Sequence, residues 1–174
     1  MLLCSLQNSA IFTHASWMQR RPRISQYFGE NPQIYSQFGL KAHCGLDYGV
    51  PEGTAVFAPI DGMVKVKNSG TAGYGLHVRI RNPHKACEIV LGHLSEVLVT
   101  DGQRVSVGDK IGLSGNTGFS TGAHVHEGFR LLKTGDFKNV FGWEVLDYNN
   151  GYKGYIDHLE FLINWKGNFL KNSL

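Results

Sequence analysis

The chain has 174 residues, a length that suits one domain and can bury roughly 70% of its unfolded surface. Its formal net charge of +3 is mild and its basic residues form no long run, so it lacks the footprint of a nucleic-acid-binding protein. No apolar run approaches the ~20 residues of a membrane span, and we recognise no secretion signal in residues 1–12.

Glycine and cysteine usage narrow the fold class. The 22 glycines are nearly twice the usual share of about 7%, and long runs rich in Ala, Leu, Glu and Lys are absent. These features predict many short strands and turns, and therefore a mainly β protein. The cysteines are odd in number and widely spaced, which predicts neither a disulfide framework nor a paired-cysteine zinc site: Cys4, Cys44 and Cys87.

Three segments are expected along the chain. Residues 1–23 have no clean periodicity and are expected to form an N-terminal extension. Residues 24–131 should form a β core, and the aromatic-rich residues 132–174 should pack on it as a C-terminal segment. Within that last segment, Asp157 with an acidic residue three positions on predicts the start of a short helix that runs to about Trp165.

Short apolar segments separated by turn residues predict the strands of the core. Sequential strands tend to pair, and folding a sheet over or closing it removes exposed edges. The expected architecture is therefore a folded antiparallel sheet, either a barrel or a sandwich. The expected strands lie within residues 53–67, 74–81, 87–93, 105–112 and 124–130.

Two histidines stand one residue apart within residues 112–130. In a strand, His124 and His126 would project from the same face, and the glycine-rich loop before them could shape a groove. If residues 43–47 run extended, His43 and Asp47 also share a face. By itself, the H-x-H spacing fits a structural pair bonded to the backbone equally well.

Together these side chains suggest a metal site, because neutral imidazole and carboxylate groups are suited to zinc. A catalytic zinc keeps three protein ligands and one open position for water. Five candidates would leave two for acid–base chemistry: His43, Asp47, His93, His124 and His126.

Three motifs carry a resemblance to a known family. They are HCGLD at residues 43–47, GHL at residues 92–94 and GNTGFSTGAHVH at residues 115–126. With these motifs the sequence resembles the lysostaphin/LytM-type zinc endopeptidases of peptidoglycan. The resemblance covers residues 24–131 in the family's order.

The resemblance implies both a fold and a set of roles. The fold would be a folded antiparallel, barrel-sandwich-like sheet, called a duplicated hybrid motif, in a single domain with a groove over the metal. One Zn²⁺ per chain would be bound by His43, Asp47 and His126, and His93 with His124 would be the catalytic acid–base pair. The substrate would be a peptide of peptidoglycan, cleaved at the bacterial cell wall or in the periplasm.

The tail of the chain is similar to family members found in phage and prophage tail regions. The similar stretch is residues 149–159, where those members usually carry a proline in place of His158. Since no secretion signal is recognised, this similarity predicts a phage- or prophage-associated wall hydrolase, an endolysin with phage tail or virion proteins as partners.

Three residues of the core depart from the pattern of the family, and one of them, Leu91, replaces the tyrosine that is usual two places before His93 and removes no ligand. Cys44 follows the first expected ligand, and a thiolate there could compete for zinc, but strand alternation predicts that it fills space behind the site. Glu127 follows His126 and is expected, by the same alternation, to face away from the metal. The remaining histidines are expected to be structural or to lie on the surface or in loops: His14, His77, His84 and His158.

Three other functions remain open at this point. A catalytically inactive relative could serve as a structural or regulatory module, although all five site residues are present. A barrel-sandwich carrier of the lipoyl or biotinyl kind would need neither the H-x-x-x-D motif nor the H-x-H motif. A hydrolase that uses Cys44 as nucleophile lacks the surroundings typical of such a residue.

Overall fold

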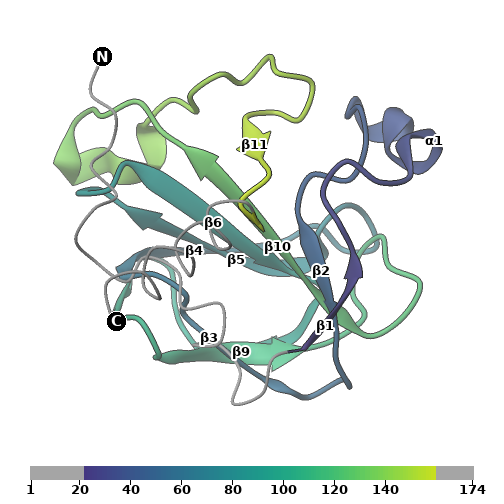
Figure 1. Ribbon diagram of the computed structural model, residues 1–174. Coiled ribbons are helices and arrows are strands. Elements are labelled where there is room, and N and C mark those ends of the chain that lie inside the picture. The colour runs from purple at the N-terminus through teal and green to yellow at the C-terminus, as the bar shows by residue number, and fades with distance from the viewer. Residues whose placement is uncertain (1–21, 160–174) are drawn as a thin grey trace, which may run out of the picture.

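Antiparallel β-strands dominate the computed structural model, which describes residues 22–159 (Figure 1). The larger sheet contains β1 (Arg23–Gln26), β2 (Leu46–Gly49), β4 (Gly62–Asn68), β5 (Leu76–Asn82), β6 (Cys87–Gly92), β8 (Arg104–Val105), β10 (His124–Leu131) and β11 (Tyr155–Ile156). The smaller sheet contains β3 (Ala55–Phe57), β7 (Leu94–Val97) and β9 (Lys110–Ser114). The helical elements are short: α1 (Pro32–Tyr35), η2 (Ser36–Phe38) and η3 (Phe137–Gly142).

The strand order brings distant parts of the chain together at β10. The larger sheet has the order β1-β2-β10-β6-β5-β4-β8, and β11 also pairs with β10. The smaller sheet has the order β3-β9-β7. The last long strand is therefore inserted between β2 and β6, in antiparallel pairs with both. The mainly β class and the folded antiparallel sheet predicted from the sequence are confirmed.

One hydrophobic core joins the two sheets. In Figure 1, β3 and β9 lie beneath the strands β4, β5, β6 and β10, and one cluster of buried side chains draws on both layers. Fully burying a Val, Leu or Ile side chain contributes about 1.5–3 kcal/mol, so this cluster is a main source of stability. Its members include Val56, Val64, Val78, Ile80, Ile89, Leu91, Ile111 and Val125.

Alternation along β10 separates this core from a second, polar face. Val125 and Phe129 belong to the core, so His126, Gly128 and Arg130 project from the opposite side. The segments around α1 and β11 lie on that opposite side, away from β3 and β9 (Figure 1). The polar face is therefore covered in part by chain from both ends of the described range.

Glutamate and histidine form a buried pair on the core side of β10. Glu127 points away from His126, as expected, and its Oε1 atom lies 3.4 Å from Nε2 of His158. His158, which was predicted to lie at the surface or in a loop, does lie outside the helices and strands, but its side chain is completely buried. A buried carboxylate needs a partner, and the chain after β11 returns over β10 to supply one.

The predicted C-terminal helix and N-terminal extension lie only partly within the described residues. The Asp157 carboxylate accepts a hydrogen bond from the backbone N–H of Leu159 at 2.9 Å, as an N-cap does. The rest of the expected helix to Trp165 lies outside the described residues, as does most of the expected extension of residues 1–23. Between residues 22 and 159, no helix has the length and apolar content needed to cross a membrane.

Candidate metal centre

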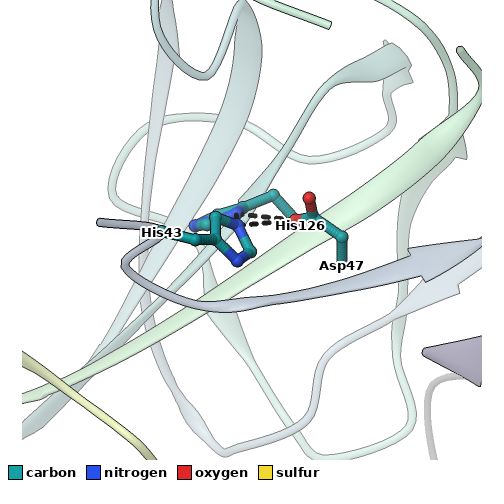
Figure 2. Close-up of side chains that lie close together, drawn as sticks. All are labelled: His43, Asp47 and His126. Atoms are coloured by element: carbon teal, nitrogen blue, oxygen red, sulfur yellow. Dashed lines mark hydrogen bonds and ion pairs between the residues drawn. The ribbon is translucent and has the colours of Figure 1, made fainter. Parts of the chain in front are cut away.

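Three side chains converge at one buried point on the polar face of the larger sheet (Figure 2). Oδ1 of Asp47 lies 3.0 Å from Nε2 of His43 and 2.9 Å from Nδ1 of His126. The two ring nitrogens are themselves 3.0 Å apart. These three donors could hold a metal ion, and each side chain is almost fully buried.

Strand pairing explains how the three residues meet. Asp47 in β2 lies directly opposite His126 in β10, and directly paired residues on one face have neighbouring side chains. His43 precedes β2, which begins only at Leu46, and reaches the same point through a bend at Gly45. A Cβ atom at Gly45 would lie 2.6 Å from Cε1 of His126, so only glycine leaves room for the ring.

The protons around His43 show that the cluster fits a cation. Nδ1 of His43 lies 3.0 Å from the carbonyl oxygen of Tyr27, so it must carry a proton and donate it. In the neutral ring, Nε2 is then an acceptor, and it faces the Asp47 carboxylate, which is also an acceptor. Two acceptors at this distance need a proton or a metal ion between them. A histidine held by a carbonyl at its far nitrogen is typical of metal ligands.

The electrostatics favour the protonation states that a metal requires. Burial alone would raise the pKa of Asp47, but hydrogen bonds and charge interactions with His126 and His43 hold it well below its usual range. Burial also lowers the pKa of His126, although Asp47 opposes this shift. At neutral pH the site therefore presents an ionised carboxylate and a neutral imidazole, as ligands must be.

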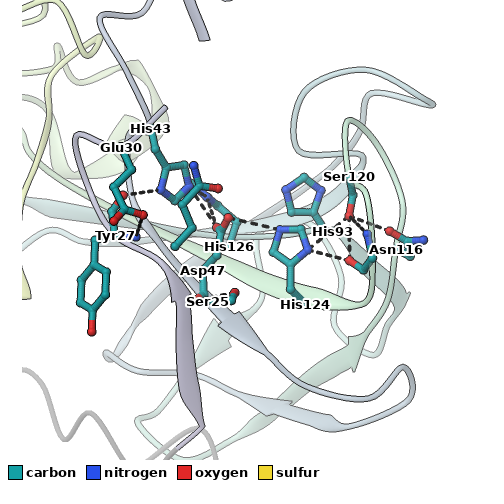
Figure 3. Close-up of polar contacts among 12 residues, drawn as sticks. Ser25, Tyr27, Glu30, His43, Asp47, His93, Asn116, Ser120, His124 and His126 are labelled. Atoms are coloured by element: carbon teal, nitrogen blue, oxygen red, sulfur yellow. Dashed lines mark hydrogen bonds and ion pairs between the residues drawn. The ribbon is translucent and has the colours of Figure 1, made fainter. Parts of the chain in front are cut away.

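Two more histidines lie beside the three donors (Figure 3). His124 projects from the same face of β10 as His126, and its Nε2 atom lies 3.6 Å from Oδ2 of Asp47. His93 follows β6 in a left-handed backbone conformation, with a φ of 61°. Its ring centroid is 4.4 Å from that of His124 and 6.1 Å from that of His126. The structure thus brings together all five residues singled out from the sequence.

Loop carbonyls fix the tautomers of these two rings. Nδ1 of His93 donates to the carbonyl of Thr117 at 2.7 Å, and Nδ1 of His124 donates to that of Gly122 at 2.8 Å. In its neutral form, each ring therefore has a lone pair on Nε2. Burial, together with His126 and His124, lowers the pKa of His93 to about 3, so this ring is neutral at pH 7.

A groove with a volume of about 1080 Å³ covers the site. Tyr35 and Phe38, from the segment between β1 and β2, line one part of it, and residues 119–123 line another. The Phe38 and Phe119 rings meet edge to face, with centroids 4.9 Å apart, so these two parts of the lining touch. The groove therefore lies over the metal centre and is bounded by aromatic side chains from two segments of the chain.

Aromatic side chains that were not among the predicted site residues support the ligands. The Tyr74 ring stacks on His126 with centroids 4.9 Å apart, and Tyr35 lies 5.2 Å from His43. Burial, followed by the charge of Asp47, raises the pKa of Tyr35 to about 12, so its hydroxyl stays protonated. The short Gly73-Tyr74-Gly75 motif is the one signal in the sequence that marks Tyr74.

Cys44 does not lie behind the site, contrary to the prediction. Its Sγ atom is 3.2 Å from the hydroxyl of Tyr74, and it lines the same groove. Strand alternation fails here because residues 43–45 precede β2. Burial raises the pKa of the Cys44 thiol to about 11, so it remains protonated and is a poor metal ligand. His77 is buried and structural, as expected, with Nδ1 bonded to the carbonyl of Gly75.

The fold and the donor set define a class. A folded antiparallel sheet that gathers two histidines and one aspartate at a buried point, with two free imidazole nitrogens beside them, is the arrangement of a metal-dependent hydrolase. The chain belongs to peptidase family M23, whose model matches residues 41–140. The resemblance to lysostaphin/LytM-type endopeptidases inferred from the sequence is thereby confirmed.

Relatives and solved structures agree with this family. The chain is 40% identical over 114 residues to an uncharacterized metalloprotease of Haemophilus influenzae, covering 66% of this chain and 24% of the relative. It is 42% identical over 85 residues to the peptidoglycan DD-endopeptidase ShyA of Vibrio cholerae, covering 48% of this chain and 19% of ShyA. The catalytic domain of the prophage-encoded M23 protein EnpA of Enterococcus faecalis is 32% identical, with a TM-score of 0.53, over 62% of this chain and 79% of that chain.

Proposed function

We propose that this chain is a zinc endopeptidase that hydrolyses peptide cross-links or stem peptides of bacterial peptidoglycan. The observation that carries the proposal is the convergence of His43 Nε2, Asp47 Oδ1 and His126 Nδ1 beneath a groove, with His93 and His124 beside them. Relatives named as peptidoglycan DD-endopeptidases support the substrate class. The chain spans about a quarter of the length of the curated relatives that it matches.

His43, Asp47 and His126 would hold one Zn²⁺ per chain. When bound, zinc acts as a Lewis acid on a carbonyl and lowers the pKa of a coordinated water to about 7. The carbonyl of Tyr27 keeps the His43 ring in the tautomer that presents Nε2 to the site. Three protein donors leave a coordination position for water and substrate.

His93 and His124 would divide the proton chemistry. Because His93 is buried and neutral, its Nε2 atom can accept a hydrogen bond from the attacking water and orient it. The side chain of His124 is 15% exposed, so it can exchange a proton with solvent, accept one from the water and donate it to the leaving amine. The groove lining from residues 119 to 123 would hold the peptide beside both rings.

Mass spectrometry of fragments released from purified peptidoglycan tests the proposed reaction. Zinc-loaded protein should release fragments with new peptide amino termini, and chelated protein should release none. A glycosidase would instead produce new reducing sugar ends. The proposal is wrong if zinc-loaded protein releases no fragments from several wall types, or if only sugar bonds are cut.

We also infer that the enzyme acts at the cell wall or in the periplasm after delivery by a phage or prophage. Two observations support this: the similarity of residues 149–159 to phage-tail members, and the prophage-encoded relative EnpA. Quantitative proteomics of phage particles purified from producing cells should find the chain at a constant ratio to tail proteins. Its presence in the cell fraction alone would contradict virion association.

A further inference from the structure

The polar face of the larger sheet continues beyond the metal centre. In β10, Arg130 lies four residues after His126, and its side chain is therefore on the same face of the sheet. Arg130 is paired with Glu88 in β6, which is in turn paired with Arg81 in β5. Arg79 lies in β5 two residues before Arg81, on the same face and nearer to the metal centre. The register therefore lines up three arginines and one glutamate along the face that carries His126.

These four residues form a buried charge cluster with excess positive charge. The Glu88 carboxylate accepts hydrogen bonds from Nε of Arg81, Nε of Arg130 and Nη1 of Arg79, at 2.5, 2.8 and 3.2 Å. Burial would raise the pKa of Glu88, but the three guanidinium groups lower it, so the carboxylate is ionised. One negative charge faces three positive charges, and a net positive potential remains.

Arg79 makes fewer hydrogen bonds than the other two arginines of the cluster and so has more unpaired N–H donors. Arg81 also bonds the carbonyls of Val140 and Trp143, and Arg130 also bonds that of Lys153. The Arg79 side chain is 21% exposed, whereas those of Arg81 and Arg130 are each 7% exposed. Glu88 occupies Nη1 of Arg79, and Nε of Arg79 is buried without a hydrogen-bond partner among the described residues.

The free donors of Arg79 belong to the groove of the metal centre. Arg79 and Arg130 both line it, and among the described residues Asp47, a metal-centre side chain, is the only acidic group that does so. With Nη1 engaged, Nε and Nη2 form the edge of the guanidinium that binds a carboxylate through two parallel hydrogen bonds. Because Nε is buried and the side chain is 21% exposed, binding a ligand in this way requires the Arg79 side chain to turn that edge toward the groove.

We propose that Arg79 forms an anionic subsite that binds a carboxylate of the substrate, an inference that rests on the proposed endopeptidase function. Arg79 lies two strands and two residues from His126, roughly 12 Å across the sheet. An extended peptide advances about 3.3 Å per residue, so the bound carboxylate lies a few residues from the cleaved bond. Stem peptides of peptidoglycan carry carboxylates both on side chains and at their carboxyl ends.

A purely structural role for Arg79 explains the cluster less well. Arg81 and Arg130 already bind both oxygens of Glu88, and the Arg79 contact is the longest of the three hydrogen bonds. Replacing Arg79 would therefore leave Glu88 paired. The Arg79→Gln variant is expected to fold, which circular dichroism and thermal unfolding check.

Cleavage of matched peptides tests the subsite. A synthetic cross-linked stem peptide is compared with analogues in which each carboxylate in turn is a carboxamide, which separates side-chain from terminal carboxylates. For wild type, one of these changes should lower kcat/KM about ten-fold, the scale of a charge-assisted hydrogen bond. Arg79→Gln should cleave the parent peptide about ten-fold more slowly and no longer distinguish that analogue. The control Arg104→Gln, at an exposed arginine of β8 outside the groove, should behave as wild type.

Other outcomes separate this inference from the proposed function. Equal discrimination by wild type and Arg79→Gln would overturn the subsite while leaving the endopeptidase intact. If zinc-loaded wild type cleaves none of the peptides, the proposed function fails, and fluorescence anisotropy with labelled peptides then decides the subsite. Equal affinity for acid and amide peptides, or no binding, would overturn it. If Arg79→Gln does not fold, Arg79→Lys is tested instead. This variant keeps the positive charge but cannot make two parallel hydrogen bonds, so it should retain only part of the preference for the carboxylate peptide over its carboxamide analogue.

Discussion

The rings of His93 and His124 stand 4.4 Å apart, centroid to centroid, and both are oriented by carbonyls of the same loop. Thr117 and Gly122, which accept their Nδ1 protons, lie between β9 and β10. Residues 119–123 of this loop also line the groove. The glycine-rich segment therefore shapes the groove and sets the tautomers of both proposed acid–base groups.

Separate roles for His124 and His126 should be visible in two variants. His124→Ala is expected to keep zinc and to lose about 10²- to 10⁴-fold in the rate of peptidoglycan cleavage, the usual contribution of a general acid or base. His126→Ala should lose both zinc and activity, because a donor of the metal centre is removed. Metal analysis and turbidity clearance measure the two effects. Wild-type cleavage by His124→Ala would show that this ring takes no part.

Glycine at position 45 should be essential for the metal centre. A Cβ atom there would meet the His126 ring and the backbone carbonyl of Glu127, so Gly45→Ala should displace His126. We expect zinc affinity to fall on the order of 10- to 100-fold, as it does when the support of a ligand is lost. Gly49→Ala, at the end of the adjoining strand β2, is the control, because its Cβ would make only ordinary contacts. Equal zinc affinities in calorimetric titrations would contradict this explanation.

The charge cluster around Glu88 should contribute substantially to the free energy of unfolding. Replacing Glu88 by Gln leaves three arginines without their shared carboxylate, two of them buried, and should lower the free energy of unfolding by about 3–5 kcal/mol. Urea unfolding at pH 7 measures this loss. Arg104→Gln, outside the cluster, should change stability little. A difference below about 1 kcal/mol for Glu88→Gln would show that the cluster contributes little to stability.

The lowered pKa of Glu88 predicts how the stability of the fold changes at acid pH. The pKa of Glu88 is lower in the folded protein than its usual value of 4.5, so the unfolded chain binds the proton more readily. Its stabilising contribution is complete above pH 4.5 and is lost as the pH falls through that value toward the folded pKa. Between pH 6 and pH 3, wild type should therefore lose more stability than Glu88→Gln. Parallel stability curves for the two proteins would contradict this pH dependence.

The sequence was sufficient to predict what depends on short-range periodicity. Alternation placed His124 and His126 on one face, and the expected strand segments match β3 to β6 and β9 to β10 within a few residues. The resemblance to a family placed His43, Asp47 and His93 with them. The fold class and the composition of the site were therefore predictable before the structure.

Features that depend on long-range register were not predictable. Cys44 lies on the groove side because a bend at Gly45 interrupts the alternation assumed for residues 43–47. His158 is buried because the chain after β11 returns to Glu127. The charge cluster exists only because β5, β6 and β10 pair in one register, which brings Arg79 to Glu88. No local pattern in the sequence records such pairings.

Cleavage rate measured against zinc bound per chain tests most directly whether His43, Asp47 and His126 form the working metal centre. Metal-free protein is titrated with Zn²⁺, and the bound metal and the release of peptidoglycan fragments are measured in the same samples. We expect activity to rise in proportion to bound zinc and to level off at about one ion per chain, as three ligands with one open position predict. Full activity without bound metal, or zinc binding that leaves peptidoglycan intact, would contradict it.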